Sequence, residues 1–332
     1  MVVRLTIAFV WALTITACAQ QPQAPSEADK SYEAAWNYLK QADATKSPDE
    51  SASNLLRAIA QCDVAARITS SSFRPQALAA HCYSQLARLE RVPERHRDLV
   101  QKARERFGRA ANCPDVEPAC LREWAEMLMA ECDEPENATQ RRQLLDETRK
   151  VCELGLKLPG FTGERARLRR SLGTCLVLLA QSDTDDAAKR GIYQEAIHQF
   201  AFVGEVESVA GTPRLYTHWG VALLEYGKLT NDHQVLWQAA ERLLTALEND
   251  PHNLEARYNL VCAYALMNEP DNAMRNLRIC LENDDTSRTY YQTAARDPDL
   301  NSLRHTSAYN EVFGEKPSRS VDSLNKRTIS DR

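Results

Sequence analysis

Glycine is scarce in this chain, with only 11 in 332 residues, and the glycine-rich loops that hold phosphates are absent. The sequence has no G-x-x-x-x-G-K-[ST], no G-x-G-x-x-G and no G-x-S-x-G, and no H-E-x-x-H that would place two histidines on one helix face. These absences count against the common nucleotide-binding, hydrolase and metalloprotease sites. A formal net charge of only −5 also gives no support for nucleic-acid binding.

Ten cysteines occur, but none forms a C-x-x-C pair. Apart from Cys18 their number is odd, and most lie in helical patterns where a small apolar residue would serve. Cys113 and Cys120 differ, because they flank a proline-bearing connection, and we predict that a disulfide, if one forms, joins them. The alternative is that both are small buried hydrophobes. The seven histidines have no spacing that completes a zinc site, so neither a metal nor a cofactor is expected.

The first residues have the pattern of an export signal. Arg4 is followed by an apolar run from Leu5 to Ile15, which is too short for a comfortable transmembrane helix. The run ends in Ile-Thr-Ala-Cys at residues 15–18, which resembles the lipobox of bacterial lipoproteins and implies lipid attachment at Cys18. The alternative is ordinary signal cleavage after Ala19, because residues 17–19 also have the A-x-A form. Residues 18–30 then form a polar tether.

Apolar residues from about residue 31 recur at the three-and-four spacing of helices with one buried face, and no convincing strand pattern appears. The spacing of Leu260, Tyr264, Ala273, Leu277 and Cys280 resembles that of a tetratricopeptide repeat, a helix-turn-helix unit of about 34 residues. An earlier segment matches the same pattern at Tyr216, Trp219, Gly220, Leu223, Ala239, Leu243, Ala246 and Pro251. The resemblance implies an all-α, right-handed solenoid of about five to six repeats.

The predicted organisation follows from these patterns. Residues 1–17 are a signal peptide, 18–30 the lipidated cysteine and tether, 31–285 the repeat array, 286–313 a C-terminal helical cap and 314–332 a disordered tail. Polar stretches such as Asp183 to Lys189 and Thr230 to Gln234 are predicted to be extra loop residues between the two helices of a unit.

The resemblance also implies where a partner would bind, because set positions on the first helix of each repeat face a concave groove. On this chain these positions include a set of arginine, hydroxyl and aromatic side chains: Arg122, Arg167, Arg170, Thr174, Arg214, Thr217 and Tyr258. The four arginines would bind carboxylates of an acidic segment or a chain terminus. The alternative is that they pair with nearby acids such as Glu164.

The expected function is that of a non-catalytic, membrane-anchored scaffold that binds a partner protein's peptide or helix in the groove. A structural subunit of an envelope or secretion complex, using its convex face, is the alternative, and an enzyme is less favoured. The lipobox resemblance places the protein at the bacterial envelope. Because Ala19 rather than an acidic residue follows Cys18, the expected location is the outer membrane, facing the periplasm.

Overall fold

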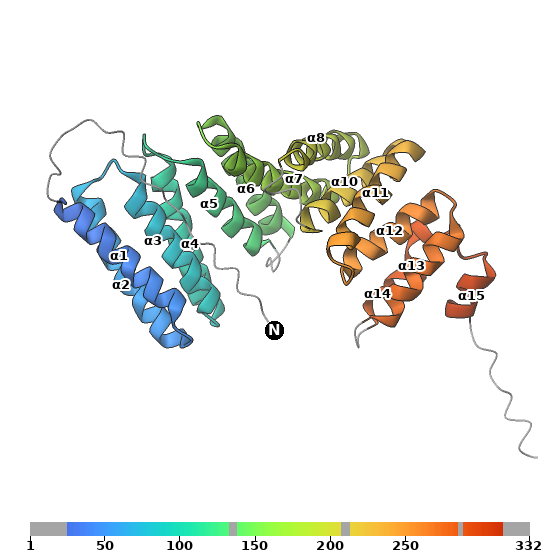
Figure 1. Ribbon diagram of the computed structural model, residues 1–332, viewed down its shortest axis with the longest axis horizontal. Coiled ribbons are helices and arrows are strands. Elements are labelled where there is room, and N and C mark those ends of the chain that lie inside the picture. Colours follow the sequence, from blue (N-terminus) through green and yellow to red (C-terminus); the bar gives the residue numbers. More distant parts are fainter. Residues whose placement is uncertain (1–24, 133–137, 207–212, 285–287, 315–332) are drawn as a thin grey trace, which may run out of the picture. The chain divides into compact units, whose positions relative to one another are not determined.

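The computed structural model describes residues 25–132, 138–206, 213–284 and 288–314, and all regular structure in these ranges is helical (Figure 1). The helices are α1 (Glu27–Ala44), α2 (Pro48–Ile68), α3 (Phe73–Leu89), α4 (Pro93–Ala111), α5 (Pro118–Glu131), α6 (Ala138–Lys157), α7 (Thr162–Gln181), α8 (Asp186–Gly204), α10 (Pro213–Thr230), α11 (His233–Asn249), α12 (Leu254–Leu266), α13 (Pro270–Glu282), α14 (Thr289–Arg296) and α15 (Ser307–Phe313). The predicted signal peptide, Cys18 and the last 18 residues lie outside the described ranges.

Helices pack in consecutive pairs, α1 with α2, α5 with α6, α7 with α8, α10 with α11 and α12 with α13. The predicted all-α fold of tetratricopeptide-like helical hairpins is therefore confirmed. The chain divides into two compact units within α4, between Arg106 and Phe107.

The first unit contains α1, α2, α3 and most of α4. Its helices begin where the sequence supplies caps: the Ser26 side chain accepts from the backbone of Asp29, and Ser47 precedes Pro48 in the first turn of α2. Fully buried Ala35, Leu55 and Cys62 belong to its core. Cys62 thus occupies a place that any small apolar side chain could fill.

The second unit extends from Phe107 through α15. Its paired helices approach closely at glycines, as a Cβ added to Gly173 would lie 2.7 Å from the Phe200 ring and one added to Gly220 would lie 2.6 Å from Leu243. The first helices of successive pairs also touch one another, α5 against α7, α7 against α10, and α10 against α12. This contact brings side chains from three or four hairpins onto one surface.

Two loop predictions were wrong. Most of the stretch from Asp183 to Lys189 is the first turn of α8, where the Asp185 side chain accepts from the backbone of Ala187. The stretch from Thr230 to Gln234 is a short turn, because Asp232 caps α11 immediately after α10 ends. The additional residues lengthen the helices, since the acid at each site is a good N-cap.

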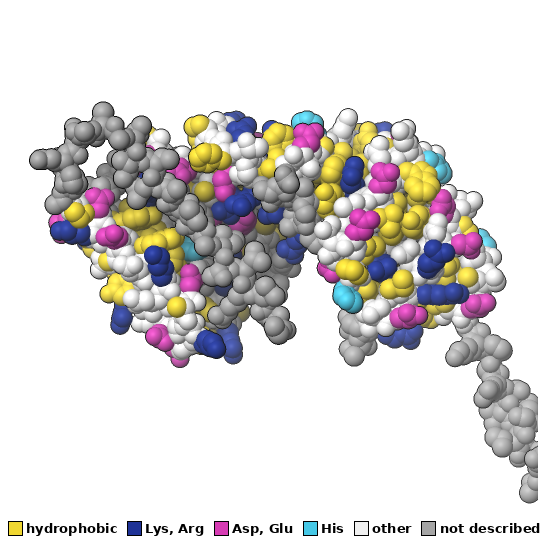
Figure 2. Space-filling view, viewed as in Figure 1, with side chains coloured by type: hydrophobic (Ala, Val, Ile, Leu, Met, Phe, Trp, Pro, Cys, Tyr) yellow, Lys and Arg dark blue, Asp and Glu magenta, His cyan; other side chains and the backbone are white. Residues whose placement is uncertain are grey.

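A short helical segment follows the last full pair. The helix α14, a 3-10 turn from Pro298 to Leu300, and α15 pack through buried Ala294, Leu300 and Tyr309 onto the core that α12 and α13 share. Within the described residues no helix is both long enough and apolar enough to cross a membrane. Over α10 to α13, side chains of both charges are interspersed with hydrophobic ones (Figure 2).

Candidate functional site

The predicted groove residues lie on α5, α7, α10 and α12, the first helices of four successive pairs in the second unit. Arg122 is on α5, Arg167, Arg170 and Thr174 are on α7, and Arg214 begins α10. Because α7 contacts both α5 and α10, these side chains share one neighbourhood. The charge of Arg170 interacts with those of Arg122, Arg167 and Arg214. The four arginines therefore form one group, which we call the arginine cluster.

Arg122 is buried within the cluster and paired with acids. Only 3% of the residue is exposed. Its Nε donates to Glu164 at 2.9 Å and its Nη1 donates to Glu126 at 2.9 Å. Burial opposes the charged form, but Glu126 and Glu164 outweigh it and raise the pKa of Arg122. Its hydrogen bonds are directed at the protein, as the alternative interpretation predicted.

Arg167 shares one of these acids. Its Nη1 donates to the second oxygen of Glu164 at 2.8 Å, so that Glu164 bridges Arg122 and Arg167 across α5 and α7. Nearly half of the Arg167 side chain, 45%, is exposed. One carboxylate thus neutralises part of the cluster while Arg167 keeps donors that face solvent.

Arg170 and Arg214 form no hydrogen bond or ion pair within the described ranges. Burial lowers the pKa of Arg170; Glu126 opposes this effect, and the neighbouring arginines lower the pKa further. Arg214 is exposed at the start of α10. A partly buried guanidinium without an acid partner is a strong binding group for a carboxylate or phosphate, because charge-assisted hydrogen bonds strengthen as water is excluded.

His218 belongs to the same surface, and the sequence interpretation missed it. It lies one helical turn after Arg214, and its Nδ1 is 3.1 Å from Thr174 Oγ1 on α7. Burial, with the charges of Arg214 and Arg170, lowers the pKa of His218 to about 4. The spacing of four residues from Arg214 was the available signal, since it places both side chains on one helix face.

Two predicted groove residues, Thr217 and Tyr258, form hydrogen bonds outside the arginine cluster. Thr217 is 1% exposed, and its Oγ1 accepts from Asn253 Nδ2 at 3.1 Å, at the start of α12. The Tyr258 hydroxyl donates to Asp297 Oδ2 at 2.8 Å, and its ring lies beside that of Tyr290. The structure therefore does not bring Tyr258 to the arginine cluster but uses it to hold the segment after α14.

The best-placed group of metal-ligating atoms in the described ranges is Cys262, Asp297 and Asp299. Both acids already have donors: Tyr258 donates to Asp297, and Lys228 Nζ lies 2.8 Å from Asp299. Burial and the adjacent Asp297 raise the pKa of the Cys262 thiol well above its usual range, so it stays protonated. The group is a polar network that joins α10 and α12 to the chain end.

Cys113 and Cys120 are buried free thiols in the structure, which does not contain the predicted disulfide between them. Burial raises the pKa of both thiols. The lipidation predicted at Cys18 lies outside the described residues.

Comparisons with known proteins give a fold likeness but no family. No family model matches the chain, and no curated protein matches it. A solved structure of PilF from Pseudomonas aeruginosa is similar at 13% identity and a TM-score of 0.45, covering 86% of this chain and 96% of its own. BtubC from P. vanneervenii has 17% identity, a TM-score of 0.44, and coverages of 71% and 90%.

Yeast Tom70 is a more remote match, with 13% identity, a TM-score of 0.28, and coverages of 84% of this chain and 65% of its own. Likenesses at these scores carry no argument about function.

Proposed function

We propose that this protein is a non-catalytic scaffold that binds an acidic segment of a partner protein at the arginine cluster. The observation that carries the proposal is the gathering of Arg170 and Arg214, without acid partners in the described residues, beside Arg167 and His218. Two separate helices, α7 and α10, supply these groups, so the surface depends on the fold and not on one local run of basic residues.

The chemistry favours a carboxylate ligand. A guanidinium presents parallel N–H donors that match the two oxygens of a carboxylate. Glu164 already accepts one hydrogen bond from Arg122 and one from Arg167, each through a different oxygen, so a carboxylate can bridge two arginines of the cluster. An incoming Asp or Glu side chain, or a chain terminus, would give Arg170 and Arg214 the same partner.

The test is fluorescence anisotropy with a labelled hexaglutamate peptide and a hexaglutamine peptide of equal length. We expect the wild type to prefer hexaglutamate, and the preference to fall as salt rises. Arg170→Gln and Arg214→Gln should each weaken binding by about tenfold, because each removes a charge-assisted bond. Arg190→Gln, an exposed arginine on α8, is the control and should bind like the wild type. Equal affinity for both peptides, or binding that survives the double variant, would contradict the proposal.

Catalysis by the Thr174–His218 pair is not proposed. A general base works best when its pKa lies near the working pH. His218, with a pKa of about 4, is a weak base there. Its hydrogen bond to Thr174 is better explained as holding α7 against α10.

Export and lipid attachment at Cys18 complete the proposed function. An acylated cysteine would confine the scaffold to a membrane surface and raise the local concentration of its partner. Mass spectrometry of the mature chain from a bacterial host is the test: we expect a diacylated or triacylated N-terminal cysteine, and release into the soluble fraction for Cys18→Ser. An unmodified chain beginning at residue 20 would show signal cleavage without lipidation.

A second candidate function is assembly into an envelope complex through the outer helices. Trp237 and Leu244 favour it, because they are 48% and 42% exposed and lie two turns apart on one face of α11. Sedimentation of native extracts would test it. If the extracts contain a large complex, the double variant Trp237→Ser and Leu244→Ser should dissociate it, and Arg170→Gln should leave it intact. This result would support assembly over groove binding.

A further inference from the structure

A polar hollow in the first unit contains a buried side chain that has no partner. The hollow lies where α1 ends and α2 begins and has a volume of about 650 Å³. Asn54 forms part of its wall and is only 6% exposed. In the ranges that the structure describes, its side-chain amide makes no hydrogen bond. The donor and acceptor of this amide, without a protein partner in those ranges, line the hollow, so they are available to a ligand that enters it.

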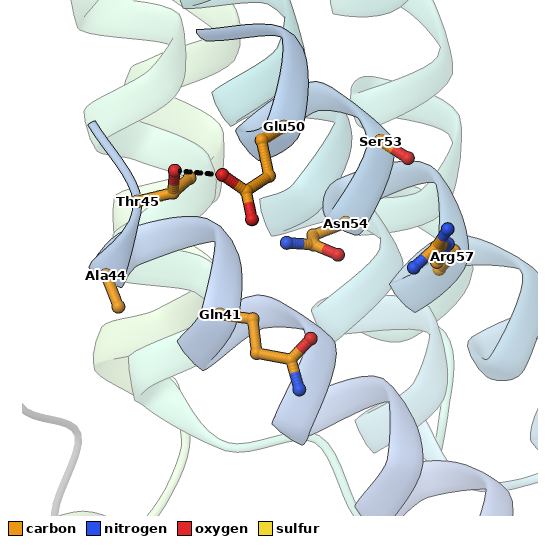
Figure 3. Close-up of a pocket in the computed structure, with 7 residues that line it drawn as sticks. All are labelled: Gln41, Ala44, Thr45, Glu50, Ser53, Asn54 and Arg57. Carbon is orange, nitrogen blue, oxygen red and sulfur yellow. Dashed lines mark hydrogen bonds between the residues drawn. The ribbon is translucent and has the colours of Figure 1, made fainter. Parts of the chain in front are cut away.

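Charged groups of opposite sign flank Asn54. Glu50 and Arg57 are four residues before it and three after it on α2, a spacing that places all three on one helix face. Figure 3 shows Asn54 between Glu50 and Arg57, with Gln41 of α1 across the hollow. Glu50 accepts a hydrogen bond from the Thr45 hydroxyl at 2.7 Å and keeps its other oxygen for a further donor. The Arg57 guanidinium is 5.9 Å from the centre of the Tyr38 ring, which supports it from one side.

We propose that this hollow binds a free dipeptide. Glu50 would bind the ammonium group, Asn54 the single peptide group, and Arg57 the terminal carboxylate. A side-chain amide both donates and accepts, as a peptide group does, so Asn54 complements the middle of such a ligand. The proposal is independent of the arginine cluster, which lies in the other unit.

Distance selects the length of the ligand. The Cα atoms of Glu50 and Arg57 are about 10.5 Å apart along the helix, at 1.5 Å per residue. A charge-assisted hydrogen bond of about 2.8 Å at each end leaves about 5 Å for the ligand. An extended dipeptide spans about 6–7 Å and a tripeptide about 10 Å, so the dipeptide exceeds this gap by about 1–2 Å, which a small outward swing of the Glu50 and Arg57 side chains accommodates, whereas the tripeptide exceeds it by about 5 Å.

Isothermal titration calorimetry of the full chain with L-alanyl-L-alanine is the test. We expect saturable binding of one dipeptide per chain, and binding at least tenfold weaker for free alanine, trialanine, N-acetyl-dialanine and dialanine amide. Asn54→Ala should weaken dialanine binding by about tenfold, because it removes the amide that lies between Glu50 and Arg57 and would bind the peptide unit. Arg67→Gln, at an exposed site later on α2, is the matched control and should bind like the wild type.

The two charged residues give the sharper readout. Glu50→Gln should remove the preference for dialanine over its N-acetyl form, and Arg57→Gln should remove the preference over its amide. Circular dichroism would establish that each variant keeps its helices. No saturable dialanine binding by the folded wild type, or equal binding by the Asn54, Glu50 and Arg57 variants, would overturn the proposal. If N-acetyl-dialanine and dialanine amide bind as tightly as dialanine, the proposal is also overturned. The hollow would then be a site for one internal or terminal segment of a longer chain.

Discussion

The hydroxyl of Tyr258 donates a hydrogen bond of 2.8 Å to Asp297, and this bond joins α12 to the segment between α14 and the chain end. Asp297 also accepts from the Cys262 thiol, 3.7 Å away, and caps the 3-10 turn through the backbone of Asp299. The cap over the last repeat is thus held by a buried polar contact as well as by apolar packing.

Tyr258→Phe should therefore loosen the C-terminal cap. The variant keeps the ring and removes the donor, so a partly buried carboxylate loses a partner, which costs about 1–2 kcal/mol of unfolding free energy. Urea unfolding measures the loss, and limited proteolysis should cut after residue 284 sooner than in the wild type. Tyr38→Phe is the control, because its hydroxyl has no hydrogen bond in the described ranges. Equal losses in both variants would count against the specific role of the Asp297 contact.

Arg122→Met should destabilise the second unit far more than Arg167→Met. Arg122 is buried and is shared by Glu126 and Glu164, whereas 45% of the Arg167 side chain is exposed. Removing Arg122 leaves Glu126 without its hydrogen-bonded arginine and Glu164 with Arg167 alone, and because both carboxylates keep some exposure we expect about 3 kcal/mol. For Arg167→Met we expect less than about 1 kcal/mol. Thermal unfolding distinguishes the two, and adding Glu164→Gln to Arg122→Met should restore part of the loss.

The sequence predicted the hairpins because apolar spacing and caps are local properties. Gly220 belongs to the repeat pattern in the sequence, and the structure places the Leu243 side chain against it. The grouping of the arginines also followed from their places on successive first helices. Periodicity reports which face of a helix a side chain occupies, and for these residues that was enough.

The sequence could not predict which acidic and basic side chains would pair with one another. Glu164 could have paired with Arg122, Arg167 or Arg170, and only side-chain rotamers decide that it takes the first two. The position of the Asn54 amide in a hollow, without a protein hydrogen bond in the described ranges, has no sequence signal, because asparagine on a helix is usually solvated or bonded to its own backbone. Polar insertions were also misjudged, since an acid followed by helix-forming residues extends the next helix as readily as it makes a loop.

Gly173→Ala and Gly191→Ala should change stability in opposite directions. A Cβ at residue 173 would lie 2.7 Å from Phe200, so overpacking outweighs the better helix propensity of alanine, and we expect a loss of about 1–2 kcal/mol. At Gly191, on α8, a Cβ would meet nothing within 4 Å, and the same change should stabilise by about 0.5–1 kcal/mol. Chemical unfolding of both variants is the measurement. A gain at residue 173 would mean that α7 and α8 separate at little cost.

His218 should make stability depend on pH between about 6.5 and 4. In the unfolded chain this histidine takes up a proton near its ordinary pKa of 6.5, but in the folded chain it does so only near 4. The unfolded state therefore binds more protons in this window, and stability falls as the pH is lowered through it, by at most about 1.4 kcal/mol per pH unit. His218→Gln should flatten that slope. An unchanged slope would show that His218 is protonated in the folded state at neutral or mildly acidic pH.

The buried thiols should differ in reactivity, with Cys113 reacting first. Its exposure is 9%, whereas Cys62 and Cys152 are fully buried, and burial raises the pKa of each of the latter two to about 12. Since the thiolate is the reactive form, iodoacetamide at pH 8 should label native Cys113 slowly and Cys62 and Cys152 only after unfolding.

The same labelling tests the predicted disulfide between Cys113 and Cys120. If the chain is exported to an oxidising compartment and the bond forms, protein purified without reductant should lack Cys113 labelling and gain it on reduction. Peptide mapping should then find residues 113 and 120 cross-linked, with two hydrogen atoms fewer than in the reduced form. A Cys120→Ala variant labelled at Cys113 with or without reductant is the control. Labelling of wild-type Cys113 without reductant would mean that both residues serve only as small hydrophobic side chains between α4 and α5.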